Sequence, residues 1–338
     1  MKTKLILGLC GIGVALILIF GGATYYMRHN KPPSLTVYCG VDEPYASQIF
    51  TLFEQRTGIH ITAQYDIESS KSVGLAARLE AEAQHPQADV WWGSEAFLSV
   101  RLAEEGILTS YRPSTANDVP ATYRDADGYW TGVGLRARVL AIADPPPPFA
   151  VTGLNDLLDP RLKGKICISR PTAGATGAQL AALYVTWGPD RTREFCKRLH
   201  DNGIALLGGN AEVADAVGDG QYLVGVTDSD DVSNSQTNGK KLTMVVPDQS
   251  GDGTLAMPTT VALVAGSKQS DAAKRLIDFL TSPEVEQKLI DLKFARWSVR
   301  GDLSGGLKAY PVNYHAAAES FRQAQRESAD LMEGRATQ

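Results

Sequence analysis

The sequence predicts an α/β protein with two lobes. Three observations predict it: strands and helices alternate over residues 35–104, they alternate again over 153–227, and two long apolar stretches, 132–143 and 254–264, connect these sets. The chain has 338 residues, of which 43% are hydrophobic, so it can bury the cores of two globular units. The alternation predicts that each lobe is a mainly parallel sheet flanked by helices. The two crossings predict a hinge between the lobes.

These crossings predict three segments: residues 1–31 before the domain, a discontinuous first lobe of 32–143 plus 255–338, and a second lobe of 144–254. In the first lobe the pattern predicts strand 35–40, helix 45–57, strand 60–65, helix 71–83, strand 88–92 and helix 94–104. In the second it predicts helix 153–158, strand 165–169, helices 176–187 and 190–202, strand 203–207, helix 210–218 and strand 222–227. After the return strand we expect helices 270–280 and 283–292 and a final surface helix from His315.

The amino-terminal segment predicts export. Residues 5–27 are apolar and uncharged after Lys2 and Lys4, and about 20 such residues suffice to cross a bilayer. We interpret them as an uncleaved membrane anchor, followed by a short Pro-containing linker. Cleavage near Ala23 and a lipoprotein at Cys10 are the alternatives.

The remaining chain is acidic. Residues 32–338 carry 29 basic and 38 acidic residues, a formal charge of −9, which argues against a nucleic-acid partner. Cys39, Cys167 and Cys196 lie outside the anchor. Cys167 and Cys196 could form a disulfide or could both be core residues, and both interpretations stay open. No nucleophile elbow, zinc-protease motif or P-loop occurs, so we expect no enzyme and no certain cofactor.

Several segments together resemble a known family. They are Val37-Tyr38, Phe53-Glu54-Gln55-Arg56-Thr57-Gly58-Ile59, Ala88-Asp89-Val90-Trp91-Trp92, the strand Gly253 to Gly266, and the helix with Ser282-Pro283-Glu284. Over residues 35–300 the chain resembles the periplasmic solute-binding protein of an ABC importer, and most closely the ferric-iron type. The resemblance implies a type II periplasmic-binding-protein fold, a location outside the cytoplasm, and an ABC permease with its ATPase as partners.

In an open α/β lobe, ligands bind beyond the carboxyl ends of the strands, so the loops there supply the candidate ligand-binding residues. In the first lobe these are Asp42, Glu43, Tyr45, Ser70, Lys71 and Glu95, and in the second they are Thr176, Gly177, Asn210, Asp228, Asp230 and Asp231. Arg136 and Arg138 alternate on the crossing stretch, so both face one side. They are candidates for binding an anion or for ion pairs at the hinge.

The ferric-type proteins that the chain resembles commonly hold the metal with a His, a Glu and an adjacent Tyr pair. Here Glu95 falls at the Glu position, Asp42 or Glu43 occupies the His region, and Asp228-Ser229-Asp230-Asp231 replaces the Tyr pair. Glu95, Asp42 and Asp228 are therefore the candidate ligands for Fe³⁺. Glu95 and the Asp228 segment could instead serve as caps of the helices that follow them.

The predicted function is reversible capture of a small ligand between two lobes. The resemblance implies ferric iron with a synergistic anion as the transported ligand. The missing Tyr pair and the hydroxyl-rich helix starts favour an organophosphate or aminophosphonate. A sensory domain and a hydrolase are further alternatives.

Overall fold

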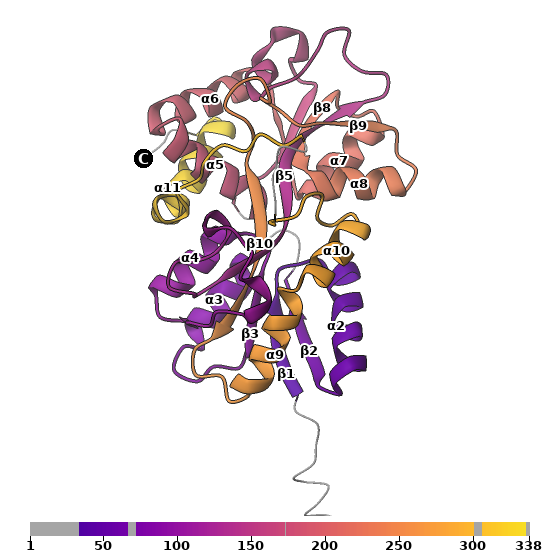
Figure 1. Cartoon of the computed structure of the whole chain (residues 1–338). Coiled ribbons are helices and arrows are strands. Elements are labelled where there is room, and N and C mark those ends of the chain that lie inside the picture. The colour runs from indigo at the N-terminus through magenta and orange to yellow at the C-terminus, as the bar shows by residue number, and fades with distance from the viewer. Residues whose placement is uncertain (1–33, 67–71, 173, 301–305, 336–338) are drawn as a thin grey trace, which may run out of the picture.

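The computed structural model describes residues 34–66, 72–172, 174–300 and 306–335, and it confirms a two-lobe α/β fold (Figure 1). The predicted anchor, residues 5–27, lies outside the described residues. So do Ser70 and Lys71. Within the described ranges, no helix combines the length and apolar character that a bilayer crossing requires.

Each lobe has its own strands and helices. The first lobe contains β1 (Ser34–Cys39), α2 (Glu43–Thr57), β2 (His60–Tyr65), α3 (Val73–Ala81), β3 (Val90–Gly93), α4 (Ala96–Glu104), β4 (Leu108–Thr109), α9 (Ser270–Leu280) and α10 (Pro283–Asp291). The second contains β6 (Ile166–Ser169), α5 (Gly174–Thr186), α6 (Pro189–Asp201), β7 (Ala205–Leu207), α7 (Asn210–Gly218), β8 (Val224–Asp228), α8 (Ser229–Thr237) and β9 (Leu242–Val245). Short 3-10 helices cover Ser114–Ala116, Ala121–Tyr123, Leu154–Leu158 and Pro160–Leu162.

Two long strands join the lobes. β5 (Thr131–Ala143) and β10 (Ala256–Val264) run antiparallel to each other through the middle of the molecule (Figure 1). They merge the expected two sheets into one with the strand order β2-β1-β3-β10-β5-β8-β6-β7. Pairing is parallel among β1, β2 and β3 and among β6, β7 and β8, as predicted, whereas β5 and β10 pair antiparallel with their neighbours. Every residue of β5 is buried because it lies in the centre of this sheet.

Local sequence features explain the end of α2, the start of α10 and the packing of α9. α2 stops at Gly58, whose φ of 69° is the left-handed conformation that glycine adopts without a Cβ clash. α10 begins with Ser282, which accepts a hydrogen bond from Val285 N at 3.3 Å, followed by Pro283. α9 buries its apolar face against β10 in the first-lobe core.

The last helix, α11 (Tyr314–Met332), packs between other helices. It contacts α5 and α6 of the second lobe and α4 of the first (Figure 1). Phe97 of α4 lies 5.5 Å from the Tyr314 ring and 6.0 Å from the Phe321 ring, and Glu327 accepts a hydrogen bond from Arg193 of α6 at 2.7 Å. The expected final helix is present: its alanine-rich face is buried against the other helices, and its opposite face is exposed. The residue boundaries predicted for the lobes stay a prediction.

The three cysteines outside the predicted anchor are buried, and none of them forms a disulfide in the structure. The structure therefore contains no Cys167–Cys196 disulfide, and the interpretation as core residues holds. Burial raises the pKa of the Cys167 thiol to about 12. At neutral pH this thiol is protonated and acts as an apolar filler.

A buried carboxylate fixes the hinge strand to the first lobe. Glu286 of α10 is 2% exposed and accepts hydrogen bonds from Gly134 N at 2.9 Å, Val299 N at 2.6 Å and Arg300 Nη1 at 2.8 Å. Gly134 has a φ of 61°, and Glu286 satisfies the amide that this turn of the backbone exposes. The carboxylate thus compensates donors that would otherwise be buried without an acceptor.

We predict that Glu286→Ala lowers the free energy of unfolding by about 3–5 kcal/mol, because it leaves Arg300 Nη1 and the amides of Gly134 and Val299 without their acceptor. Glu284→Ala on the same helix is the matched control. Its ion pair with Arg56 is exposed, so its loss should cost about 1 kcal/mol or less. Urea denaturation followed by circular dichroism measures both, and equal effects would contradict this role of Glu286.

Candidate functional site

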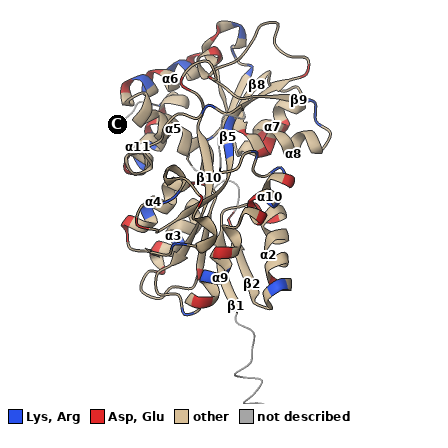
Figure 2. Cartoon of the chain, in the orientation of Figure 1, with Lys and Arg blue, Asp and Glu red and all other residues tan. Residues whose placement is uncertain are grey.

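Four buried charges meet where β5 passes from one lobe to the other. We call Arg136, Arg138, Asp228 and Asp230 the junction cluster. The antiparallel register places Arg138 opposite Asp228, the last residue of β8, and Asp230 lies in the first turn of α8. Each of the four is at most 3% exposed. The basic part of β5 therefore lies beside the acidic start of α8 (Figure 2).

Arg138 organises the second lobe. Its Nη1 donates to Asp228 Oδ1 at 2.7 Å and to Asn210 Oδ1 at 2.9 Å. Its Nε donates to Gln179 Oε1 at 3.0 Å, and its Nη2 donates to Thr176 Oγ1 at 3.1 Å. One guanidinium thus links β5 to α5, to α7 and to the end of β8.

Arg136 connects the cluster to the first lobe. Its Nη1 lies 3.0 Å from Asp230 Oδ2 and 3.3 Å from Asp228 Oδ2, whereas its Nη2 donates to the Ser94 carbonyl at 2.8 Å. The guanidinium also lies 5.2 Å from the centre of the Phe294 ring. It therefore contacts groups from both lobes at once.

Electrostatics keep Arg136 charged despite its burial. Desolvation alone would lower its pKa, but the carboxylates of Asp230, Asp228, Asp42 and Asp231 outweigh it and raise the pKa above its usual value. This also shows that loops from both lobes converge on Arg136. The prediction that Arg136 and Arg138 form hinge ion pairs is confirmed, and a direct role of either in binding a ligand stays a prediction.

Glu95 caps the helix that follows it. Its carboxylate accepts from Phe97 N at 2.5 Å and from Leu98 N at 3.2 Å, so the capping interpretation describes this structure. The side chain is 1% exposed. Burial raises its pKa to about 7, while the two backbone donors and the charges of Arg101 and Arg136 act in the opposite direction. A carboxyl that titrates near neutral pH beside the junction cluster is a functional-site candidate.

The other predicted residues of the first lobe lie at its edge. Asp42 is the N-cap residue of α2 and is half-buried, Glu43 is exposed, and Tyr45 is half-buried with its ring 5.1 Å from that of Phe294. Asp42 is close enough to act on Arg136 electrostatically. Of these residues, only Asp42 acts on Arg136, and a role of all three in binding a ligand stays a prediction.

In the second lobe, Thr176 and Asn210 are buried and bind Arg138, as described above. Thr176 also shares a hydrogen bond with Ser169 at 2.5 Å. Gly177 differs, because a Cβ at this position would clash with Gln325 of α11. Its backbone faces α11, and a role of Gly177 in binding a ligand stays a prediction.

The carboxylates suited to a metal ion differ from the predicted set. Among the described residues, Asp228, Asp230 and Asp231 each place one oxygen within 4.8 Å of the others. The predicted set of Glu95, Asp42 and Asp228 does not form such a group there, because Glu95 is directed at its own helix amides. Two of the three grouped aspartates already pair with arginines.

Three residues of this region were not among the predicted site residues. Gln179 lies in the middle of a predicted helix, Ser94 contributes only its carbonyl, and Phe294 follows α10 in a loop. The helical period of α5 could have found Gln179, because it lies three residues after Thr176 and hence on the same face.

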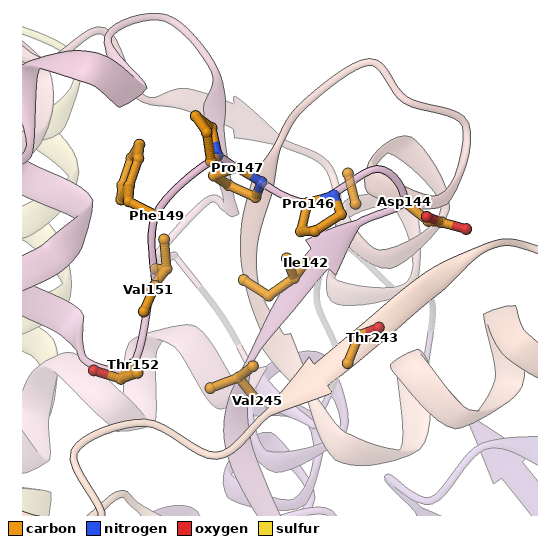
Figure 3. A pocket seen from close by; sticks show the side chains of 12 residues that line it. Ile142, Asp144, Pro146, Pro147, Phe149, Val151, Thr152, Thr243 and Val245 are labelled. Carbon is orange, nitrogen blue, oxygen red and sulfur yellow. The ribbon is translucent and has the colours of Figure 1, made fainter.

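A separate cavity of about 590 Å³ lies at the far end of β5 (Figure 3). Its lining is mainly apolar: Ile142, Ala143, Asp144, Pro146, Pro147, Pro148, Phe149, Ala150, Val151, Thr152, Thr243 and Val245. None of the predicted ligand-binding residues lines it. We therefore place the candidate site at the junction cluster.

Residues 35–291 match the model of a family described as bacterial extracellular solute-binding protein. The chain belongs to this family. This membership confirms the resemblance to extracellular solute-binding proteins found in the sequence. A relative from Sinorhizobium fredii, 30% identical over 62% of this chain and 60% of its own, is described as a probable ABC transporter periplasmic-binding protein.

A relative from Salmonella typhimurium described as a putative 2-aminoethylphosphonate-binding periplasmic protein is 27% identical over 75% of this chain and 74% of its own. Among solved structures, the ferric binding protein from Campylobacter jejuni has a TM-score of 0.79 at 22% identity and covers 88% of this chain and 99% of its own. The periplasmic binding protein AfuA from Actinobacillus pleuropneumoniae, with fructose-6-phosphate bound, has a TM-score of 0.78 at 22% identity over 90% and 99% of the chains. These likenesses confirm the fold.

We predict that Glu95→Gln changes how stability depends on pH. Because burial raises the pKa of Glu95 in the folded protein from its usual 4.5 to about 7, the protonated form is the one that folding favours. Its contribution is complete below about pH 4.5 and is lost as the pH rises to 7. The wild type should therefore lose roughly 3 kcal/mol relative to Glu95→Gln across this window.

Urea denaturation at several pH values measures this difference. The surface variant Glu105→Gln, at the residue that follows the same helix, is the control and should run parallel to the wild type. A constant difference between wild type and Glu95→Gln from pH 4.5 to 7 would contradict the raised pKa.

Proposed function

We propose that the protein captures a small zwitterion that carries a phosphonate or phosphate group and an amine, and that it delivers this solute to an ABC permease. In this proposal the lobes close over the solute at the junction cluster, and no bond is made or broken. The observation that carries the proposal is Arg136, which contacts Ser94 of one lobe and Asp230 of the other while charges of both signs surround it.

Donors for an anion are present at this place. Arg136 Nε and Gln179 Nε2 are buried and have no hydrogen-bond acceptor within the described ranges. In addition, α7 begins at Gly209 without a hydrogen bond from a capping side chain. Helix amides of this kind and buried donors favour a phosphonate or phosphate oxygen.

The acidic residues favour a positive group on the same ligand. In the part of the chain that is described, four aspartates act on Arg136, and Arg138 is the second arginine of the cluster. A cation or ammonium group that enters here lowers the electrostatic energy of these carboxylates, whereas a ligand with negative charge alone does not. A zwitterion satisfies both signs, so no charge stays buried and unpaired when the lobes close.

The comparison with the aminophosphonate-binding relative supports this ligand class, because 27% identity extends over three quarters of both chains. The absence of catalysis is part of the same proposal, and it is supported by relatives described as transport proteins. Tethering of the protein by residues 5–27 is likewise proposed, on the apolar run alone.

Ferric iron with an anion is the second candidate. The grouping of Asp228, Asp230 and Asp231 within 4.8 Å favours it, because carboxylate oxygens suit a hard cation. Against it stands the use of two of these carboxylates by Arg136 and Arg138. A ferric ion would have to displace those guanidinium groups or share their acceptors.

We predict that 2-aminoethylphosphonate raises the melting temperature of the protein more than ethylphosphonate does, since only the former carries the ammonium group. Asp231→Asn should reduce the affinity for 2-aminoethylphosphonate about tenfold, close to 1.4 kcal/mol, and leave ethylphosphonate binding nearly unchanged. Calorimetric titration of both ligands measures the difference. Asp219→Asn is a matched control, since Asp219 pairs with Lys240 outside the junction cluster.

The same melting assay distinguishes the candidates, because stabilisation scales with ligand concentration over dissociation constant. The largest shift with ferric citrate would favour the second candidate. The largest shift with a neutral sugar and no response to phosphonates or iron would overturn both.

A further inference from the structure

A second hollow opens between the lobes, on the side of α8 and α10. It is a groove of about 500 Å³ lined by Ser233, Gln236, Ile290, Lys293, Ala295, Arg296 and Trp297. We call it the α8–α10 groove. It contains none of the residues of the junction cluster.

The charge of this groove is opposite to that of the protein. Lys293 and Arg296 are exposed, and neither forms an ion pair with a residue that the structure describes. Residues 32–338 nevertheless have a formal charge of −9. The groove is therefore a basic patch on an acidic molecule, with the Trp297 ring 5.5 Å from the Arg296 guanidinium.

The two walls of the groove come from different lobes. Ser233 and Gln236 belong to α8 of the second lobe, whereas the residues from Ile290 onward belong to the end of α10 and the loop after it. Lys293 Nζ reaches Thr237 Oγ1 across the groove at 3.3 Å. A molecule that contacts both walls therefore detects the relative position of the lobes.

The groove also lies next to the candidate solute site. Phe294 follows Lys293 in sequence, and its ring lies 5.2 Å from the Arg136 guanidinium. Lys293 itself has a φ of 63°, a conformation that favours glycine. The chain thus has a lysine at a position where the backbone conformation favours glycine.

We propose that the α8–α10 groove receives a short acidic segment of the membrane permease. The proposal rests on the proposed function for the existence of that partner. Exposed basic groups at the rim of an open groove suit a protein partner, since such charges steer association and select complementary surfaces. A captured small solute would instead be enclosed by its site. Because the walls belong to two lobes, this segment binds best to one arrangement of the lobes, which links recognition to the loaded state.

The first test uses the full-length protein and fluorescein-labelled hexaglutamate, with anisotropy read at low and at physiological salt. Lys293→Glu/Arg296→Glu should weaken peptide binding at least tenfold, and the difference should shrink with added salt. The control Lys268→Glu/Lys288→Glu makes the same charge change at exposed positions outside the groove and should retain binding. Lys293→Gly removes one charge and suits the left-handed backbone, so it gives a folded variant with an intermediate loss.

The second test uses the protein with its permease and ATPase in proteoliposomes. The groove variant should lower solute-stimulated ATP hydrolysis at least tenfold at limiting binding protein, and excess binding protein should restore it. Its affinity for 2-aminoethylphosphonate should equal that of the wild type, which distinguishes failure at the groove from failure of the proposed ligand. Equal loss in groove and control variants, or no loss in either, would overturn the proposal.

Discussion

The buried guanidinium of Arg138 is the interaction on which the second lobe and the connecting strand depend. It is fully buried, and taking a charge out of water costs several kcal/mol unless its donors find acceptors. Asp228, Asn210, Gln179 and Thr176 supply them from β8, α7 and α5. These elements can only pack in the arrangement that brings all four acceptors to one point. The geometry at the ends of the second-lobe strands is therefore set by a polar constraint as well as by apolar burial.

The same constraint explains why the site lies on β5. Arg136 lies two residues before Arg138 and hence on the same face of the strand, so it shares Asp228 with its neighbour and reaches Ser94 in the first lobe. Binding proteins of two lobes need a place where a solute can contact both at once. β5 belongs to both lobes and carries a cation at the crossing, so it provides such a place. Little conformational entropy is lost on binding, because the backbone of β5 is already paired with β10 and β8.

Much of this fold could be predicted from the sequence. β2, α7 and α9 have the predicted bounds, because their apolar periods are regular and glycine or proline ends the neighbouring segments. β4 and β9 were not predicted. They are short, and they exist because β10 and β5 offer partners that lie far away along the chain. Pattern reasoning cannot detect pairings that only the folded arrangement creates.

The candidate site divides in the same way. The alternation of Arg136 with Arg138 and the loops that carry Asn210, Asp228 and Asp230 could be read from residue order, and the structure brings these residues together. The hydrogen-bond partners of these side chains could not be predicted from the sequence. Glu95 turns toward the amides of its own helix, and Arg136 uses the Ser94 carbonyl, an acceptor that every residue possesses. Such choices depend on distances within the folded protein.

The packing of α11 makes the two lobes depend on each other beyond the two crossing strands. Tyr314 and Phe321 cover Phe97 of the first lobe, while Glu327 binds Arg193 of the second. If either lobe unfolded alone, α11 would lose part of its support and expose apolar surface of the other lobe to water. Despite its hinge, the molecule is therefore expected to unfold as one cooperative unit, because α11 packs against both lobes.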